Sequence, residues 1–423
     1  MNGMGDFPKS VINPAFGLEW HEPGFLVGSV PLSPVTRERL GRPSAVVPDS
    51  GAGFGHDWSM TLNLDHLRRY AVARSLFKPT TLMRAIGKLG FVQADPIRAP
   101  ARAQDLTLRH RVSGYRAGEL EQRYPRLALE EDFFVNYGFL PREHHALMHP
   151  REARVVWTPT RWKQAHAVRE FIAERGAVHP REVDAHFAHG KTTNWFGGSS
   201  NASTQLLDGM HYRGMLRVAR RDGGTRVYAL RGGDAAPVDE LVAHARLDAL
   251  LDIVVRKYAP LPAASLGQLL GYLRSGVPQW QGLRAAALKR ARERLGTARI
   301  DGVDWYWPAD ENPRAARWKP DDAVRLLTPF DPVVWDRRRF ELFWGWAYRF
   351  EAYTPAPKRK LGYYALPLLW HDRVIGWANL SVAGGELQSQ FGYVDGRAPR
   401  DAAFRSACNA ELERMRIFLG LEG

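Results

Sequence analysis

Residues 160–310 contain the same order of helices and strands twice, and this repeat constrains the fold more than any other feature of the chain. Apolar periodicity in the first copy predicts three helices and then two alternating strands, over 161–175, 180–188, 202–215, 216–221 and 226–230. The second copy predicts the same order over 238–258, 265–273, 280–295, 298–300 and 303–307. Gly223-Gly224 and Asp301-Gly302 supply the two hairpin turns. Three helices closed by a two-stranded ribbon are the plan of a winged helix, so we expect two such modules in tandem.

The remaining sequence divides into three further regions. Residues 1–59 are rich in proline, carry a glycine cluster at 51–55 and predict a disordered leader, with Met60 as an alternative start of the protein. Residues 60–160 predict an N-terminal catalytic region that resembles a more distorted winged helix, before modules at 161–235 and 236–320. Short β-like runs in 321–423 predict a small antiparallel β-barrel and a closing helix near 399–418. The expected class is therefore α+β.

Charge and composition narrow the function. The 423 residues carry 59 Lys and Arg against 45 Asp and Glu, a formal net charge of +14, and only 10 of the basic residues are lysines. Arginine forms forked contacts with phosphates, so this excess favours nucleic acid over acidic lipid, although a GC-rich genome also favours arginine codons. A single cysteine, Cys408, excludes a disulfide framework, and no apolar run is long enough to span a membrane. We expect a cytoplasmic, nucleoid-associated monomer that binds double-stranded DNA.

Basic residues cluster where winged helices contact DNA. The first ribbon and the second recognition helix, together with the segment after residue 95, give these candidate DNA-binding residues: Arg98, Arg102, Arg217, Arg220, Arg221, Arg226, Arg284, Lys289 and Arg290. For Arg98 and Arg102, the alternative is a salt bridge to Glu130 or Glu131.

The best catalytic candidates lie at the end of a short strand predicted over 91–95. Alternation places Gln93 and Asp95 on one face, where a carboxamide and a carboxylate can hold one water molecule between them. The alternative is that Asp95, which precedes Pro96, only caps the following turn. His145 and His149 have a spacing found in metal-binding helices, but the sequence between them lacks the glutamate of H-E-x-x-H. We therefore predict no metal and no cofactor.

Two stretches resemble a known family. They are Gly90–Pro96 with Arg98–Leu106, and Leu326–Arg337, which continues similarly in Tyr348–Arg359 and Gly362–Pro367. Over roughly 62 to 380 the chain resembles the AlkZ/YcaQ-type bacterial winged-helix DNA glycosylases. The resemblance implies tandem winged helices and a β-barrel around duplex DNA, and excision of bulky N7-alkylated purines, including those in interstrand crosslinks. The family's catalytic pattern is Gln, an apolar residue, then Gln or Asp, and it assigns catalysis to Gln93 and Asp95.

The chemistry of such a reaction suits these residue types. A purine alkylated at N7 is already cationic, so the enzyme needs only to stabilise an oxocarbenium-like sugar and to supply water. No lysine flanks the motif, so we expect hydrolysis without a Schiff-base lyase step. A bulky lesion also makes deep base flipping unnecessary.

The sequence also departs from the family. Crosslink-acting members carry a His-Ala pair after the catalytic strand, and the corresponding segment here, Phe133–Pro141, lacks it. The specific lesion is therefore open. The alternative function is a non-catalytic winged-helix DNA-binding protein or transcriptional regulator.

Overall fold

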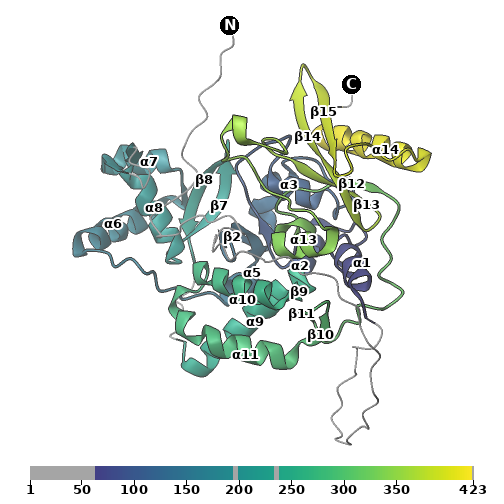
Figure 1. Cartoon of the computed structure of the whole chain (residues 1–423). Coiled ribbons are helices and arrows are strands. Elements are labelled where there is room, and N and C mark those ends of the chain that lie inside the picture. The colour runs from purple at the N-terminus through teal and green to yellow at the C-terminus, as the bar shows by residue number, and fades with distance from the viewer. Residues whose placement is uncertain (1–61, 194–198, 233–237, 422–423) are drawn as a thin grey trace, which may run out of the picture.

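The computed structural model describes residues 62–193, 199–232 and 238–421 of the chain (Figure 1). The leader expected over 1–59 lies outside these residues. Within the described part, none of the helices has the length and apolar character needed to cross a membrane. Helices and small antiparallel sheets alternate along the chain, as expected for an α+β protein.

The first predicted repeat forms a unit that we call unit B (residues 159–230). Its elements are α6 (Pro159–Arg175), β4 (Ala177–Val178), α7 (Pro180–Phe187), the short hairpin β5 (Lys191–Thr193) and β6 (Ser199–Asn201), α8 (Ala202–Tyr212), β7 (Leu216–Asp222) and β8 (Thr225–Leu230). The helices begin at residues whose side chains accept backbone N–H groups: Thr158 caps α6, His179 caps α7 and Asn201 caps α8. Gly176 ends α6 with a positive φ of 79°.

The second repeat forms unit C (residues 240–307). Its elements are α9 (Glu240–Tyr258), β9 (Leu261–Pro262), α10 (Ala263–Tyr272), the 3₁₀ turns η3 (Leu273–Ser275) and η4 (Pro278–Leu283), α11 (Arg284–Arg294), β10 (Gly296–Ile300) and β11 (Val303–Trp307). The helix predicted over 280–295 is therefore a 3₁₀ turn followed by a shorter α-helix.

An N-terminal segment, unit A (residues 82–141), has the same arrangement. It contains α2 (Leu82–Leu89), β1 (Val92–Gln93), α3 (Ala103–Leu108), α4 (Glu119–Arg123), the 3₁₀ turn η2 (Tyr124–Arg126), β2 (Leu129–Phe133) and β3 (Tyr137–Pro141). The sheets of units A, B and C have the orders β1-β3-β2, β4-β8-β7 and β9-β11-β10. In each unit, a two-residue strand after the first helix pairs with the last strand of the hairpin.

The C-terminal region contains an open sheet. After β12 (Val324–Leu326) come α12 (Pro332–Trp335), α13 (Arg337–Trp344), the 3₁₀ turn η5 (Ala356–Lys358), β13 (Leu366–Trp370), β14 (Arg373–Ala383), β15 (Glu386–Tyr393) and α14 (Ala402–Leu419). The four strands pair in the order β12-β13-β14-β15, and the described strands do not close into a ring. The predicted β-barrel is therefore wrong.

Helix α14 covers the outer edge of β12, and this explains why the sheet stays open. The backbone N–H of Leu326 donates to Glu411 of α14, and Arg414 donates to the carbonyl of Val324. Since α14 satisfies the polar groups of this edge, β15 has no edge with which to pair. The predicted closing helix thus takes the place of the strand contact that a barrel would need.

Buried ion pairs connect unit A to the C-terminal region. Arg111 and Asp331 are both fully buried and form a two-pronged pair, at 2.7 and 3.0 Å. Arg109, which is 3% exposed, pairs with Glu411 of α14. Helix α1 (Leu64–Ser75) packs beside α9, α12 and α13. The ion pairs thus fix unit A, which contains β1, against the C-terminal region.

Candidate active site

Strand β1 is shorter than the sequence predicts and ends at Gln93. It pairs with β3 through Val92 opposite Phe139 and Gln93 opposite Gly138. Position 138 requires glycine, because a Cβ there would collide with the carbonyl oxygen of Val92. Beyond Gln93, the backbone N–H of Asp95 leaves the sheet and donates to the side chain of Gln104 at 3.3 Å. Asp95 therefore lies in the loop just after the strand.

The carboxamide of Gln93 is held in one orientation. Its Oε1 accepts hydrogen bonds from Nδ2 of Asn136 and from Nε1 of Trp335, each at 3.1 Å. The residue is 3% exposed, and its Nε2 has no hydrogen-bond partner among the described residues. Because both donors engage the oxygen, Gln93 presents an N–H donor that is free to bind a water molecule or a substrate.

Asp95 combines a structural contact with a free oxygen. Its Oδ1 accepts the backbone N–H of Ile97 at 2.9 Å, which is the turn-capping role considered as the alternative from sequence. Its Oδ2 accepts no hydrogen bond from any described residue. Burial raises the pKa of the carboxyl group to about 6. Asp95 can therefore exchange a proton near neutral pH with its second oxygen while the first maintains the turn.

Aromatic side chains form the wall beside this pair. The indole of Trp335 lies 4.8 Å from the ring of Tyr258 and 5.8 Å, edge to face, from that of Tyr272. Burial, followed by the charge of Asp95, raises the pKa of Tyr364, which places that phenol near the carboxylate. Trp335 and Tyr364 belong to two of the stretches that resemble the family, Leu326–Arg337 and Gly362–Pro367. Their part in the site was not apparent from sequence.

Lys257 of α9 also reaches the segment at the start of strand β1. Its Nζ is buried, donates to the carbonyl of Phe91 and faces the rings of Phe91 and Tyr258. Burial and the charge of Arg111 lower its pKa to about 7. No lysine flanks the motif in the sequence. In the folded protein, however, Lys257 contacts Phe91, which is two residues before Gln93.

The arginines expected after residue 95 differ in their surroundings. Arg98 is exposed. Arg102 pairs with Glu121 of α4, and with neither of the acidic residues considered from sequence. Arg98 is thus the more available of the two to a ligand.

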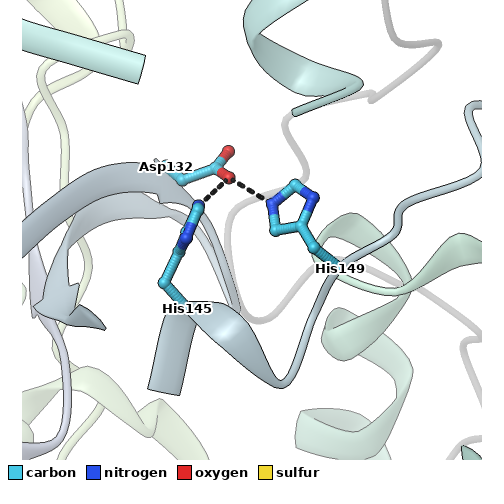
Figure 2. A group of neighbouring side chains, drawn as sticks. All are labelled: Asp132, His145 and His149. Carbon is cyan, nitrogen blue, oxygen red and sulfur yellow. Dashed lines mark hydrogen bonds and ion pairs between the residues drawn. The ribbon is translucent and has the colours of Figure 1, made fainter. Parts of the chain in front are cut away.

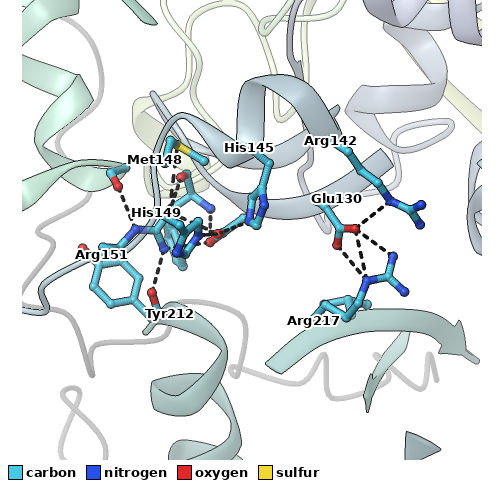
Figure 3. A network of polar contacts seen from close by, with 12 residues as sticks. Glu130, Arg142, His145, Met148, His149, Arg151, Tyr212 and Arg217 are labelled. Carbon is cyan, nitrogen blue, oxygen red and sulfur yellow. Dashed lines mark hydrogen bonds and ion pairs between the residues drawn. The ribbon is translucent and has the colours of Figure 1, made fainter. Parts of the chain in front are cut away.

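The ribbon arginines of unit B are all paired with carboxylates. Arg217 pairs with Glu130 at 2.9 Å, and Figure 3 shows this carboxylate between Arg217 and Arg142. The remaining pairs are Arg220 with Asp222, Arg221 with Glu131, and Arg226 with Asp208. Three of these four pairs join the ribbon to buried acids, so these arginines stabilise the packing of units A and B. The structure does not present them as free cations for DNA.

One of these arginines, Arg220, also lines a surface cavity. The cavity has a volume of about 610 Å³, and its other lining residues are His179, Arg181, Glu182, Asp222, Gly223 and Thr225. This cavity lies at the tip of the ribbon and contains neither Gln93 nor Asp95.

The basic helix α11 also contains both basic residues that pair with a carboxylate and basic residues that do not. Arg290 pairs with Asp248 of α9 at 2.7 Å. Lys289 is exposed, and Arg284, at the start of the helix, has no carboxylate partner among the described residues. Of the nine arginines and lysines expected to bind DNA, Arg98, Arg284 and Lys289 are therefore the ones without a described ion pair.

A buried polar cluster occupies the position of the histidine pair noted in the sequence (Figure 2). Nε2 of His145 and Nε2 of His149 lie 2.9 and 3.3 Å from Oδ2 of Asp132, and the three ligand atoms lie within 4.8 Å of one another. Arg151 donates to both oxygens of the same carboxylate, at 3.0 and 3.1 Å. Although burial acts to raise it, Arg151 and the two histidines hold the pKa of Asp132 well below its usual value.

This cluster is better suited to joining units than to holding a metal ion. Arg151 already neutralises the carboxylate, and a metal ion would have to replace the imidazole N–H bonds to Asp132 and approach the guanidinium. Arg151 also donates to the carbonyls of Phe133, Tyr212 and Gly276, which belong to unit A, unit B and unit C (Figure 3). The cluster therefore links the three units at one point.

Comparison with known proteins identifies the family of this arrangement. The family model described as "DNA glycosylase AlkZ-like" matches residues 86–418, which include Gln93 and Asp95. The structure is similar to that of the Streptomyces sahachiroi DNA glycosylase AlkZ, with a TM-score of 0.56 and 14% sequence identity, over 85% of this chain and 98% of that one. At this identity, the structural similarity shows a shared fold.

Proposed function

Because the chain belongs to the AlkZ-like DNA glycosylase family, we propose that it hydrolyses the N-glycosidic bond of bulky N7-alkylated purines in double-stranded DNA. The observation that carries this proposal is the pairing of a fixed Gln93 donor with a carboxylate, Asp95, that has one free oxygen. We further propose that units B and C are winged helices, that residues 60–160 form the catalytic region, and that the protein acts as a monomer without a cofactor.

The proposed step uses a water molecule between the two side chains. The water oxygen accepts an N–H from Gln93 Nε2 and donates to Oδ2 of Asp95. As the bond between the sugar C1′ and the base N9 breaks, its electron pair neutralises the cationic purine, and the carboxylate stabilises the positive charge on the sugar. Water then forms the new bond to C1′, and its proton passes to Asp95.

The surroundings of Lys257 support hydrolysis without a lyase step. Its Nζ is buried between two aromatic rings and donates to a backbone carbonyl, so a sugar aldehyde has no open path to it. We expect borohydride to trap no covalent protein–DNA adduct during turnover. An adduct that disappears in Lys257→Met would contradict this part of the proposal.

The proposal is tested with duplexes that each carry one defined lesion. The panel contains a small N7-methylguanine, a bulky N7-alkylguanine monoadduct, an N7–N7 interstrand crosslink and an unmodified control. We expect release of the bulky base, and the crosslink arm decides whether the enzyme acts without the family's His-Ala pair. A sequence-selective footprint on unmodified DNA, with no base released from any duplex, would instead assign the protein to non-catalytic DNA binding.

Substitution of Trp335 tests how Gln93 is oriented. Trp335→Phe keeps an aromatic ring against Tyr258 but removes one donor to Oε1 of Gln93. Since such a bond contributes about 1 kcal/mol, we expect the single-turnover rate to fall about fivefold to tenfold, with little change in DNA affinity.

The matched control is Trp346→Phe, which removes an equivalent indole bond to the carbonyl of Val374, in the C-terminal region. This variant should keep the wild-type rate. In a Gln93→Ala background, Trp335→Phe should have no further effect on the rate. An equal loss in that background would show that Trp335 acts independently of Gln93.

A further inference from the structure

Five arginines that lack acidic partners lie in two groups, one around Trp157 and one around Arg284. They come from the segment between units A and B, from unit B and from unit C, and we call them the arginine stripe: Arg154, Arg161, Arg213, Arg274 and Arg284. Among the described residues, none of the five forms a salt bridge. The ribbon arginines of unit B, by contrast, are each neutralised by a carboxylate.

The unit B end of the stripe is built on an aromatic side chain. The guanidinium of Arg213 lies 3.7 Å from the ring centroid of Trp157 and donates to the carbonyls of Val155 and Gly209. Arg161 approaches the same ring from 5.9 Å. Burial and the charge of Arg161 lower the pKa of Arg213 to about 10, although Tyr212 opposes this shift. Two cations thus share one indole, and the carboxylates of the described residues do not pair with either.

At the unit C end, too, arginines lie close together without a carboxylate partner among the described residues. Burial, and then the charges of Arg274 and Arg154, lower the pKa of Arg284. Arg284 therefore lies close to both of these arginines. Its Nε is buried and has no hydrogen-bond partner in the part of the chain that the structure describes. Arg154 donates to the side chain of Gln281 at 2.7 Å, in an exposed contact between the segment that precedes unit B and unit C. The guanidiniums at this end therefore keep donors that the described residues leave unused.

The two ends are joined, and the stripe reaches the candidate active site. Tyr212 connects them, since the charges of Arg154 and Arg213 both act on its pKa, which burial raises. At the unit C end, the charge of Arg274 acts on the pKa of Tyr272, and the ring of Tyr272 packs against Trp335. Trp335 in turn donates to Gln93. A ligand along the stripe would thus lie beside the wall of the site.

Adjacent cations without counter-ions destabilise the free protein, and an anionic ligand with regularly spaced charges relieves that repulsion. We propose that the arginine stripe binds successive phosphates of the duplex backbone next to the lesion, in place of the ribbon arginines. This inference rests on the proposed function, because it takes duplex DNA as the ligand. The aromatic wall at the end of the stripe favours DNA over a lipid surface.

The test compares two triple variants with the same change in net charge. Arg154→Gln/Arg274→Gln/Arg284→Gln removes stripe residues. Arg123→Gln/Arg256→Gln/Arg299→Gln removes three exposed arginines that pair with Glu119, Asp310 and Asp304. Affinity for unmodified duplex is measured from about 50 to 200 mM salt. Each lost phosphate contact lowers the slope of log K against log salt by about 0.9.

We expect the stripe variant to lose about two to three units of that slope and at least tenfold in affinity, while the control stays within twofold to threefold of wild type. Equal losses in the two variants, or no loss in the stripe variant, would overturn the inference. Binding of wild type to anionic phosphatidylserine vesicles but not to duplex would also overturn it. Because this assay uses unmodified DNA, a wild type that binds through the stripe but releases no base would refute the proposed function alone.

Discussion

Replacing Asp95 with asparagine is expected to slow base release by at least about a hundredfold and at the same time to stabilise the folded protein. The neutral amide can neither stabilise the sugar cation nor accept the proton of water. It can still accept the N–H of Ile97 through its oxygen, so the turn after β1 should be kept. The rate is measured with excess enzyme on the bulky monoadduct.

The gain in stability follows from the raised pKa of Asp95. Its folded-state pKa is about 6, whereas an unfolded aspartate has a pKa of about 3.9. Between these values the folded state binds more protons than the unfolded state, so this group makes stability fall as pH rises, and its full cost is present above pH 6. Asp95→Asn should therefore raise the free energy of unfolding by about 3 kcal/mol at pH 7.5, and the gain should disappear near pH 4.

The wild-type rate should fall about tenfold per pH unit below pH 6, as Asp95 becomes protonated. The control is Asp301→Asn, in an exposed hairpin turn whose positive φ of 50° asparagine tolerates well. It should change neither rate nor stability. An Asp95→Asn protein that is slow because it is less stable would contradict both the catalytic and the electrostatic argument.

Of the substitutions proposed, Arg151→Leu should lower the free energy of unfolding the most, by about 3–5 kcal/mol. The substitution leaves the buried Asp132 carboxylate without its cation and leaves three carbonyls, one in each unit, without their donor. Urea unfolding measures the loss. Arg154→Leu is the control, because Arg154 is three residues away, exposed and outside the cluster, and it should change stability by less than about 0.5 kcal/mol.

A second substitution separates the ion pair from packing. Adding Asp132→Leu to Arg151→Leu removes the uncompensated charge, so the double variant should be more stable than Arg151→Leu alone. If the second change costs stability instead, the contacts of Asp132 with His145 and His149 contribute more than its pairing with Arg151.

Local patterns predicted most of units B and C, because caps, glycine turns and apolar periodicity all act over a few residues. The two-residue strands β4 and β9 were missed, since two residues have no periodicity. The barrel was predicted wrongly because the partner of β12 is a helix about 85 residues further along the chain. Strand propensity cannot show which element covers an edge.

The candidate site was predicted in part. The motif indicated Gln93 and Asp95, which lie two residues apart at the end of β1. Trp335 lies 242 residues from Gln93, and Lys257 lies 166 residues from Phe91, so only the fold brings them to β1. The ribbon arginines show the same limit: sequence gives the charge of Arg217, but its partner Glu130 lies 87 residues earlier.

The long-range ion pairs of unit A also bear on how the protein is made. Arg109 and Arg111 leave the ribosome early, but their partners Glu411 and Asp331 follow 302 and 220 residues later. Until then, two arginines destined for the interior have no counter-charge and must remain hydrated. Removal of α14 would leave the buried Arg109 without its counter-charge, so the packing of unit A depends on a helix 302 residues further along the chain.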